Sequence, residues 1–153
     1  MTKIKEKDWE NYLVKQLQEW GWTKLDTIFR QNNHEVIDRD ILGKQLQLIN
    51  PELRTEQGEK IINELIDIPS SYQKIAENNY DFYKSLTKGV EYYDQFSQSH
   101  KKVYLINRSW EKNDFSFVQQ FKVGNLANRE EFVVFDLVLF INGIPLTIME
   151  WWW

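Results

Sequence analysis

The feature that most constrains the fold is a pair of apolar segments joined by Asn142-Gly143. Residues 132–141 read Phe-Val-Val-Phe-Asp-Leu-Val-Leu-Phe-Ile, and residues 144–150 read Ile-Pro-Leu-Thr-Ile-Met-Glu. An Asn-Gly pair between apolar runs favours a β-hairpin, because both residues accept the positive φ angles of a tight turn. The first run is apolar at consecutive positions, which is typical of a central strand buried on both faces. The sequence therefore predicts a sheet centred on the C-terminal third of the chain.

Helical patterns precede this hairpin. Asp8 is a plausible N-cap, apolar residues follow it at helical spacing, and Gly21 is a natural end. The remaining patterns predict helices over 58–66 and 72–86, a loop over 97–102, and strands over 103–106 and 115–122. The pattern between residues 22 and 50 is weak and leaves two alternatives open, which are short strands or a helix over 41–48. Helices first and strands after indicate an α/β chain with an α+β-like order, in which helices flank a mixed central sheet.

Composition and charge exclude several classes of protein. The chain has 153 residues, of which 42% are hydrophobic, so we expect residues 1–153 to form one domain with a real core. The absence of cysteine excludes disulfides, thiolate zinc sites and cysteine nucleophiles. Lys and Arg number 19 against 23 Asp and Glu, so tight autonomous DNA binding is not expected without a basic patch or partner domains. Without a signal peptide or an apolar run of membrane length, we expect a cytoplasmic protein and no membrane.

Two acids in the predicted hairpin point to metal chemistry. Asp136 interrupts the first apolar strand, and Glu150 ends the second. Burying an ionised carboxylate lowers the stability of the fold by roughly several kcal/mol unless a cation or hydrogen-bond donors compensate its charge. Carboxylate oxygens are the ligands that hard cations such as Mg²⁺ and Mn²⁺ prefer. The alternative is that Asp136 caps a strand irregularity and Glu150 is a solvated end residue.

The turn decides whether these acids can share one ion. A two-residue turn pairs Ile141 with Ile144, sets Asp136 opposite Met149, and leaves Glu150 on the other face. A three-residue loop with Gly143 in a left-handed bulge brings Asp136 and Glu150 to one face as diagonal neighbours. We predict the bulged three-residue turn.

A third acid lies in the first predicted helix. On a helical projection Glu10 falls between Val14 and Leu17, inside the apolar arc. A carboxylate on a buried face needs a partner, a proton or a metal. The alternative is an acid in the first turn that stabilises the helix dipole.

Several motifs resemble the N-terminal nuclease region of the R subunit of type I restriction enzymes (HsdR). The Asn-Gly-Ile-Pro-Leu hairpin ending in Glu150 is the most specific of them. Others are Phe-Val-Gln-Gln-Phe-Lys-Val at 117–123, Glu10 with Leu17 and Gly21-Trp22, Asn50-Pro51-Glu52-Leu53, and Asn79 through Phe82 and Leu86 to Gly89-Val90. The resemblance covers nearly the whole chain.

The resemblance implies a PD-(D/E)xK restriction-endonuclease-like core and metal-dependent hydrolysis of duplex DNA. In it, Asp136 and Glu150 are the catalytic, metal-binding carboxylates, and Glu10 is a further metal ligand. The family places a lysine two residues after the second acid, where this chain has Trp152. Loss of one preorganised charge costs a phosphoryl-transfer site about 10² to 10³ in rate. We therefore expect this exact chain to be weak or inactive, with a core incomplete at its C-terminus.

The family also implies partners. Apart from the resemblance, Gln119 and Gln120 lie on the predicted strand beside the two acids and Lys122 offers a positive charge to phosphate, so these three are the predicted DNA-binding residues. Double-stranded DNA is the expected substrate, and the methyltransferase and specificity subunits of a restriction-modification complex are the expected partners. No Gly-x-x-x-x-Gly-Lys-Ser/Thr loop occurs in these residues, so ATP is expected to act only through motor domains absent from this chain. The alternative function is a catalytically dead nuclease-like module that binds DNA or other subunits.

Overall fold

The computed structural model describes residues 6–28, 30, 32, 34–66, 75–124 and 131–151. Its helices are α1 (Glu6–Glu19), α2 (Arg39–Ile49), α3 (Thr55–Ile66) and α4 (Ile75–Lys88), with a short 3-10 helix η2 (Trp110–Lys112). Its strands are β1 (Thr23–Leu25), β2 (Val90–Asp94), β3 (Ser99–Val103), β4 (Phe115–Gly124), β5 (Phe132–Ile141) and β6 (Ile144–Met149). No helix in these ranges is both long and apolar enough to cross a membrane.

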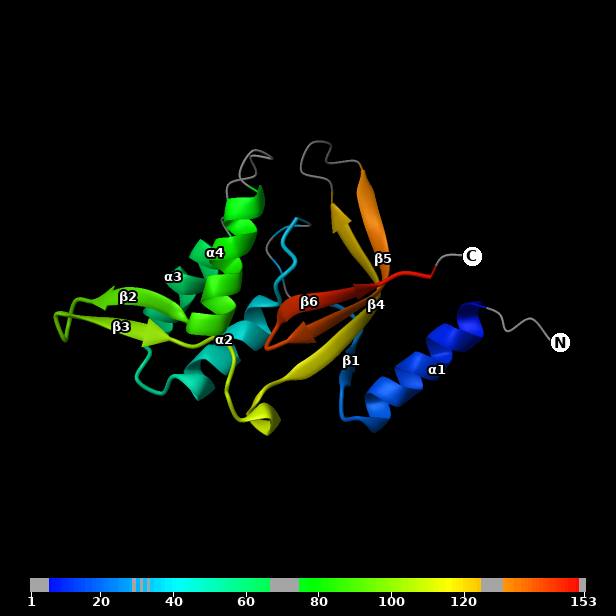
Figure 1. Ribbon diagram of the computed structural model, residues 1–153, viewed down its shortest axis with the longest axis horizontal. Coiled ribbons are helices and arrows are strands. Elements are labelled where there is room, and N and C mark those ends of the chain that lie inside the picture. Colours follow the sequence, from blue (N-terminus) through cyan, green and yellow to red (C-terminus); the bar gives the residue numbers. More distant parts are fainter. Residues whose placement is uncertain are drawn as a thin grey trace.

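The main sheet is mixed and has helices at both sides. Its strand order is β1-β4-β5-β6, with β1 parallel to β4 and the other neighbours antiparallel. Figure 1 shows α1 along one side of this sheet and α2, α3 and α4 grouped at the other, where the β2–β3 hairpin projects outward. The predicted mixed α/β class with a sheet flanked by helices is confirmed at this level.

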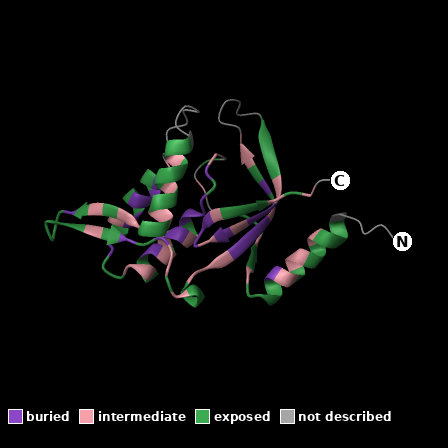
Figure 2. Cartoon of the chain, viewed as in Figure 1, coloured by how far each residue is buried: buried purple, intermediate pink, exposed green. Residues whose placement is uncertain are grey.

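Three apolar clusters hold these layers together. The first joins α2 and α3 to the end of β3 and the start of β6. The second and third lie on the two faces of the main sheet: one contains Ile28 and Val118, and the other packs Leu17 of α1 against Phe117 and Leu137. Figure 2 shows the buried residues gathered where the sheet meets α2 and α3, while the outer sides of α1 and α4 are largely exposed.

The predicted loop over 97–102 is wrong from residue 99 on, and the predicted strand over 103–106 is wrong beyond Val103. Residues 99–103 form β3, which pairs with β2 in a two-stranded ribbon. A ribbon that projects into solvent has no buried face to impose an apolar alternation, so its polar sequence resembled a loop. The backbone of Tyr104 instead bonds to one side chain: Tyr104 N donates to Asn50 Oδ1 (2.8 Å), and Asn50 Nδ2 donates to Tyr104 O (2.9 Å).

Strand β5 is central, as predicted, but it is not buried along its whole length. It lies between β4 and β6, and Leu137, Val138 and Phe140 are buried. The side chains at its start, Phe132 and Val133, are more than half exposed. The expectation of burial on both faces therefore holds only for the second half of the strand, where Leu137 packs with Leu17 of α1 on one face and Val138 packs with Ile28 on the other.

The predicted three-residue turn is wrong. Ile141 pairs with Ile144, and both intervening residues have positive φ, 53° at Asn142 and 78° at Gly143. The buried Asn142 side chain accepts from Asp114 N (2.7 Å) and donates to Leu105 O (2.9 Å), which fixes its backbone. Asp38 N, at the N-cap of α2, donates to Gly143 O (2.8 Å). The two-residue turn is thus held from both sides by its neighbours.

Candidate metal site

A β-bulge in β6 sets the relative position of the two hairpin acids. Phe140 pairs with Pro145, but the next pair along β5 is Leu139 with Thr147, so Leu146 is an extra residue on β6. Proline lacks the N–H that a sheet ladder needs, and in sheets it is confined to edges, strand starts and bulges. The shifted register continues through Leu137 and Met149. The next two residues in that register are Asp136 and Glu150.

The bulge therefore brings the two acids back together after the two-residue turn has shifted them apart. We expected a two-residue turn to separate Asp136 from Glu150, because that register sets Asp136 opposite Met149. That reasoning treated the hairpin as regular beyond its turn. Since Leu146 adds one residue to β6, the register of the last pair, Leu137 with Met149, brings Glu150 level with Asp136 when it is extended by one residue, and Asp136 N donates to Glu150 Oε1 (3.3 Å).

Asp136 is held by contacts to both of its carboxylate oxygens. Gln120 Nε2 donates to Oδ1 (3.1 Å), and the backbone N–H of Trp151 donates to Oδ2 (3.1 Å). Asp136 is half-buried, whereas Glu150 is exposed. These contacts also suit a carboxylate that caps a strand irregularity, so the role of the pair in metal binding stays a prediction.

Glu10 lies on the side of α1 that faces the sheet. Its side chain is half-buried and accepts a hydrogen bond from Gln119 Nε2 (2.7 Å). The helix begins at Glu6, so Asp8 lies inside it and is not its N-cap, contrary to our expectation. Glu10 consequently falls beyond the first turn, where an interaction with the helix dipole is weaker. A carboxylate on the sheet-facing side of the helix needs a partner, and the side-chain amide of Gln119 is that partner.

The donor set suits a hard cation. Asp136 and Glu150 offer carboxylate oxygens from adjacent strands, and Mg²⁺ is commonly held by one or two carboxylates with water completing its shell. Each carboxylate has about four lone-pair sites, so the hydrogen bonds to Asp136 leave acceptor capacity. Within the described ranges, no three acids or histidines gather closely enough to form a larger cluster, so Glu10 is not brought into the same group.

The remaining predicted residues lie around this pair. Gln119 and Gln120 bond to the acids just described, and the exposed Lys122 places its ammonium 3.4 Å from the centre of the Phe132 ring. Trp151 is half-buried and joins the apolar cluster formed by α1 and the sheet. Trp152, at the lysine position, and Trp153 lie outside the described residues.

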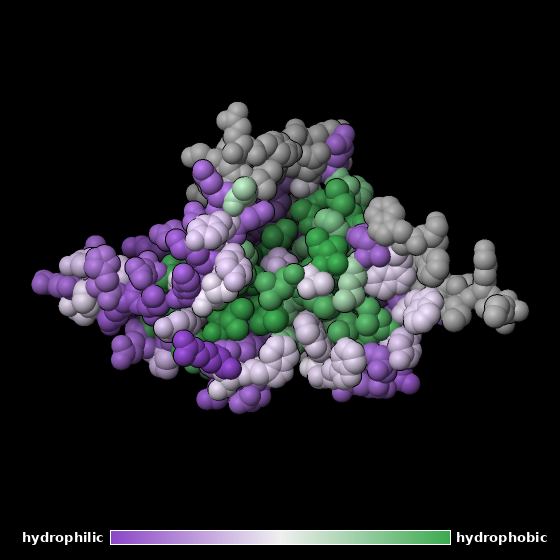
Figure 3. Space-filling view, in the orientation of Figure 1, coloured by the Kyte–Doolittle hydropathy of each residue, from purple (hydrophilic) through white to green (hydrophobic). Residues whose placement is uncertain are grey.

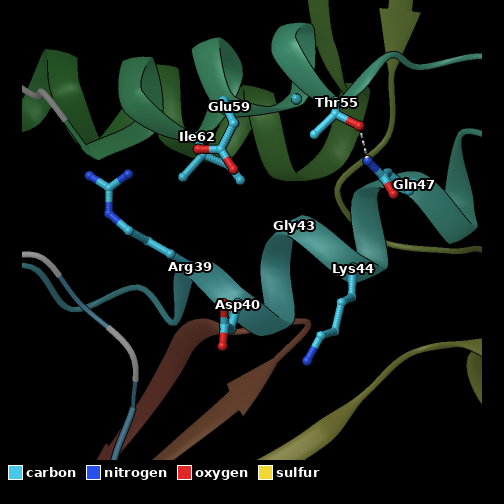
Figure 4. Close-up of a pocket in the computed structure, with 9 residues that line it drawn as sticks. Arg39, Asp40, Gly43, Lys44, Gln47, Thr55, Glu59 and Ile62 are labelled. Carbon is cyan, nitrogen blue, oxygen red and sulfur yellow. Dashed lines mark hydrogen bonds between the residues drawn. The ribbon is translucent and has the colours of Figure 1, made fainter.

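A hollow between α2 and α3 is separate from these acids (Figure 4). Gln47 Nε2 donates to Thr55 Oγ1 (2.9 Å) across it, and Arg39 bonds to Glu35 and Asn63. Its lining mixes Arg39 and Lys44 with Asp40 and Glu59. None of the predicted site residues lines it, so it adds nothing to the candidate metal site.

Two features of the site escaped the sequence analysis. The bulge at Leu146 had a signal, because Pro145 stands next to it in an otherwise regular strand pattern. The second is Gln120, which has a positive φ of 52°. Glutamine does not favour that conformation, so no sequence pattern indicated it.

Comparison with known proteins places the chain in a family. A family model described as "Type I restriction enzyme R protein N terminus" matches residues 3–151. Among the similar proteins are two from Methanocaldococcus jannaschii, named "Putative type I restriction enzyme MjaVIIIP endonuclease subunit" and "Putative type I restriction enzyme MjaIXP endonuclease subunit". The first is 31% identical over 92% of this chain, and the second is 30% identical over 79%. The matches cover 13% and 12% of those proteins' lengths. The chain belongs to the family of type I restriction enzyme R protein N-termini.

Proposed function

We propose that this chain is the endonuclease domain of a type I restriction R subunit and hydrolyses phosphodiester bonds of duplex DNA with a divalent metal. The observation that carries the proposal is the β6 bulge, which shifts the register so that Glu150 comes level with Asp136 and accepts a hydrogen bond from its backbone N–H. Two carboxylates at adjacent strand positions repel each other unless a cation, a proton or hydrogen-bond donors offset their charge. The family, and the names of the two relatives as endonuclease subunits, support nuclease chemistry.

Asp136 and Glu150 would hold Mg²⁺ or Mn²⁺. Glu10, which the described residues do not gather into one cluster with this pair, stays a proposed further ligand only. A bound cation of this kind polarises a phosphoryl oxygen and lowers the pKa of a coordinated water. The chain's own groups prepare the site: Gln120 and the Trp151 N–H fix the two oxygens of Asp136. The exposed ammonium of Lys122 supplies a positive charge for a DNA phosphate, and Gln119 and Gln120 are the other proposed DNA contacts.

Position 152 limits the activity that we expect. The motif lysine would orient the attacking water and stabilise charge in the transition state, whereas the tryptophan in this chain offers neither. We expect the activity to fall by about 10² to 10³ relative to a chain with lysine there. The sequence with Trp152 is consequently proposed to nick DNA weakly at most.

Other subunits and domains are proposed to supply DNA binding and movement. The chain has a formal net charge of −4 and spans about one eighth of its relatives, at 13% and 12% of their lengths. A domain with this charge gains little from nonspecific attraction to phosphates. We propose that the methyltransferase and specificity subunits hold the DNA and that ATP drives translocation through motor domains elsewhere in the complex.

The test is to place lysine at the motif position and assay supercoiled plasmid for Mg²⁺-dependent nicking. We expect Trp152→Lys to raise the nicking rate about 100-fold over the starting chain. Trp153→Lys is the matched control, because it adds the same charge one residue away and should give no gain. The double variant Trp152→Lys with Asp136→Asn should lose the gain.

Two results would contradict the proposal. No gain from Trp152→Lys would favour the alternative of a nuclease-like module that binds DNA or subunits without cutting. Equal nicking by Trp152→Lys with and without Asp136→Asn would show that the activity does not depend on this pair of acids.

A further inference from the structure

We infer that Gln120 is a positioning residue that fixes Asp136 for cation binding, an inference that rests on the proposed function. Gln120 lies on β4 directly across from Asp136 on β5, and its side-chain amide donates to Asp136 Oδ1 (3.1 Å). Its φ of 52° lies in the left-handed region, which is unfavourable for a residue other than glycine. The structure holds this residue in an unfavourable conformation beside a predicted metal ligand.

The left-handed residue coincides with a reversal of side-chain alternation in β4. Phe117 packs on the α1 side of the sheet and Val118 on the other side, as regular alternation requires. Phe121 should return to the side of Phe117, but it packs with Val118 instead. Regular alternation puts Phe117, Gln119 and Phe121 on one face, but Phe121 lies on the other because the chain reverses at Gln120.

The same reversal occurs on β5 at Asp136. Leu137 packs on the α1 side, whereas Phe135 packs with Phe121 on the opposite side. The paired residues on the two strands run from Gln119 with Leu137 to Phe121 with Phe135, and the pair between them, Gln120 with Asp136, is missing from the ladder. A side-chain hydrogen bond takes the place of backbone pairing at this single position.

This arrangement gives the carboxylate a defined orientation. Oδ1 is fixed by Gln120 and Oδ2 by the backbone of Trp151, so rotation of the Asp136 side chain would break both bonds. The partners that orient a ligating side chain typically change metal affinity by about 10- to 100-fold when they are removed. Gln120 itself is exposed, so its substitution removes no buried apolar contact.

The test compares Gln120→Met with a matched control in the same conformation. Methionine has nearly the length of glutamine but no amide donor, and it meets the same left-handed backbone. Gln98 is also an exposed glutamine with positive φ (50°), in the turn between β2 and β3, so Gln98→Met repeats the change away from the acids. Mn²⁺ affinity is measured by electron paramagnetic resonance of free Mn²⁺, and stability by thermal unfolding.

We expect Gln120→Met to raise the Kd for Mn²⁺ about 10-fold or more, and Gln98→Met to leave it unchanged. The melting temperatures of the two variants should shift by similar amounts, which separates positioning from folding. Equal Mn²⁺ affinity in Gln120→Met and the starting chain would overturn the inference.

Asp136→Asn distinguishes failure of this inference from failure of the proposed function. If Asp136→Asn abolishes Mn²⁺ binding while Gln120→Met leaves it intact, the metal site stands and the positioning role is refuted. If the starting chain and Asp136→Asn bind Mn²⁺ equally, both the metal site and the positioning role are refuted.

Discussion

Replacing Gly143 by alanine tests how tightly the β5–β6 turn is docked on α2. Gly143 has a φ of 78°, and an added Cβ would lie 2.5 Å from Asp38 O and 3.0 Å from Leu42 N. Both are backbone atoms at the start of α2, so neither can move aside as a flexible side chain would. The turn or the helix must shift, and the hydrogen bond from Asp38 N to Gly143 O (2.8 Å) is the first contact at risk.

The expected loss of stability follows from these contacts. The left-handed backbone alone costs alanine about 1–2 kcal/mol, and loss of a hydrogen bond adds about 1 kcal/mol. With the steric contact added, we expect Gly143→Ala to lower the free energy of unfolding by about 3 kcal/mol or more. For a domain of this size each kcal/mol lowers the melting temperature by about 2–4 °C, so we expect a fall of about 6–12 °C in thermal unfolding followed by circular dichroism.

Gly21 provides the matched control. It also has a positive φ, 87°, but no described atom lies within 4 Å of its would-be Cβ. Gly21→Ala should therefore show only the backbone cost of about 1–2 kcal/mol. Equal melting temperatures for the two variants would refute the claim that the turn is packed against α2.

Two further predictions concern charged side chains. Hydrogen bonds from Ser97, Lys101, Phe96 N and Gln57 hold the pKa of Asp94 well below its usual value of 3.8, so this carboxylate stabilises the fold above about pH 4. Urea unfolding should show Asp94→Asn less stable than the starting chain at pH 7, with the difference shrinking as the pH falls below 4; a constant difference would contradict this. Arg39 and Glu35 form a buried ion pair (2.9 Å), so Glu35→Ala should lower the free energy of unfolding in urea by about 3 kcal/mol. Lys15 forms an exposed pair of the same i,i+4 spacing, so Lys15→Ala should lower it by less than about 0.5 kcal/mol. Equal losses in the two variants would contradict the role of burial.

The sequence predicted the elements whose apolar pattern reflects burial. Strand β5, the amphipathic α3 and the Asn142-Gly143 hairpin follow from local rules, because each has a buried face or a turn with strict φ requirements. The β2–β3 ribbon was missed because a ribbon in solvent needs no apolar alternation. Asp136 and Glu150 were singled out by their positions in two apolar strands, and the resemblance to a nuclease family then implied their catalytic role.

The geometry of the site was beyond reach of the same rules. We compared two turn lengths, but the register of the acids is set beyond the turn by the extra residue Leu146. The left-handed Gln120 is fixed by contacts across the sheet rather than by its own preference. Long-range pairing thus decides which side chains meet, and a pattern read along one strand does not contain that information.

The measurement that tests the central claim most directly is Mn²⁺-induced broadening of backbone amide signals in the NMR spectrum of the ¹⁵N-labelled chain. With substoichiometric Mn²⁺, we expect the amides of Asp136, Glu150 and Trp151 to broaden first, and Asp136→Asn and Glu150→Gln each to abolish the effect. Broadening centred elsewhere, for example on the buried carboxylate of Asp94, or unchanged broadening in both variants, would contradict the assignment of this acid pair as a metal site.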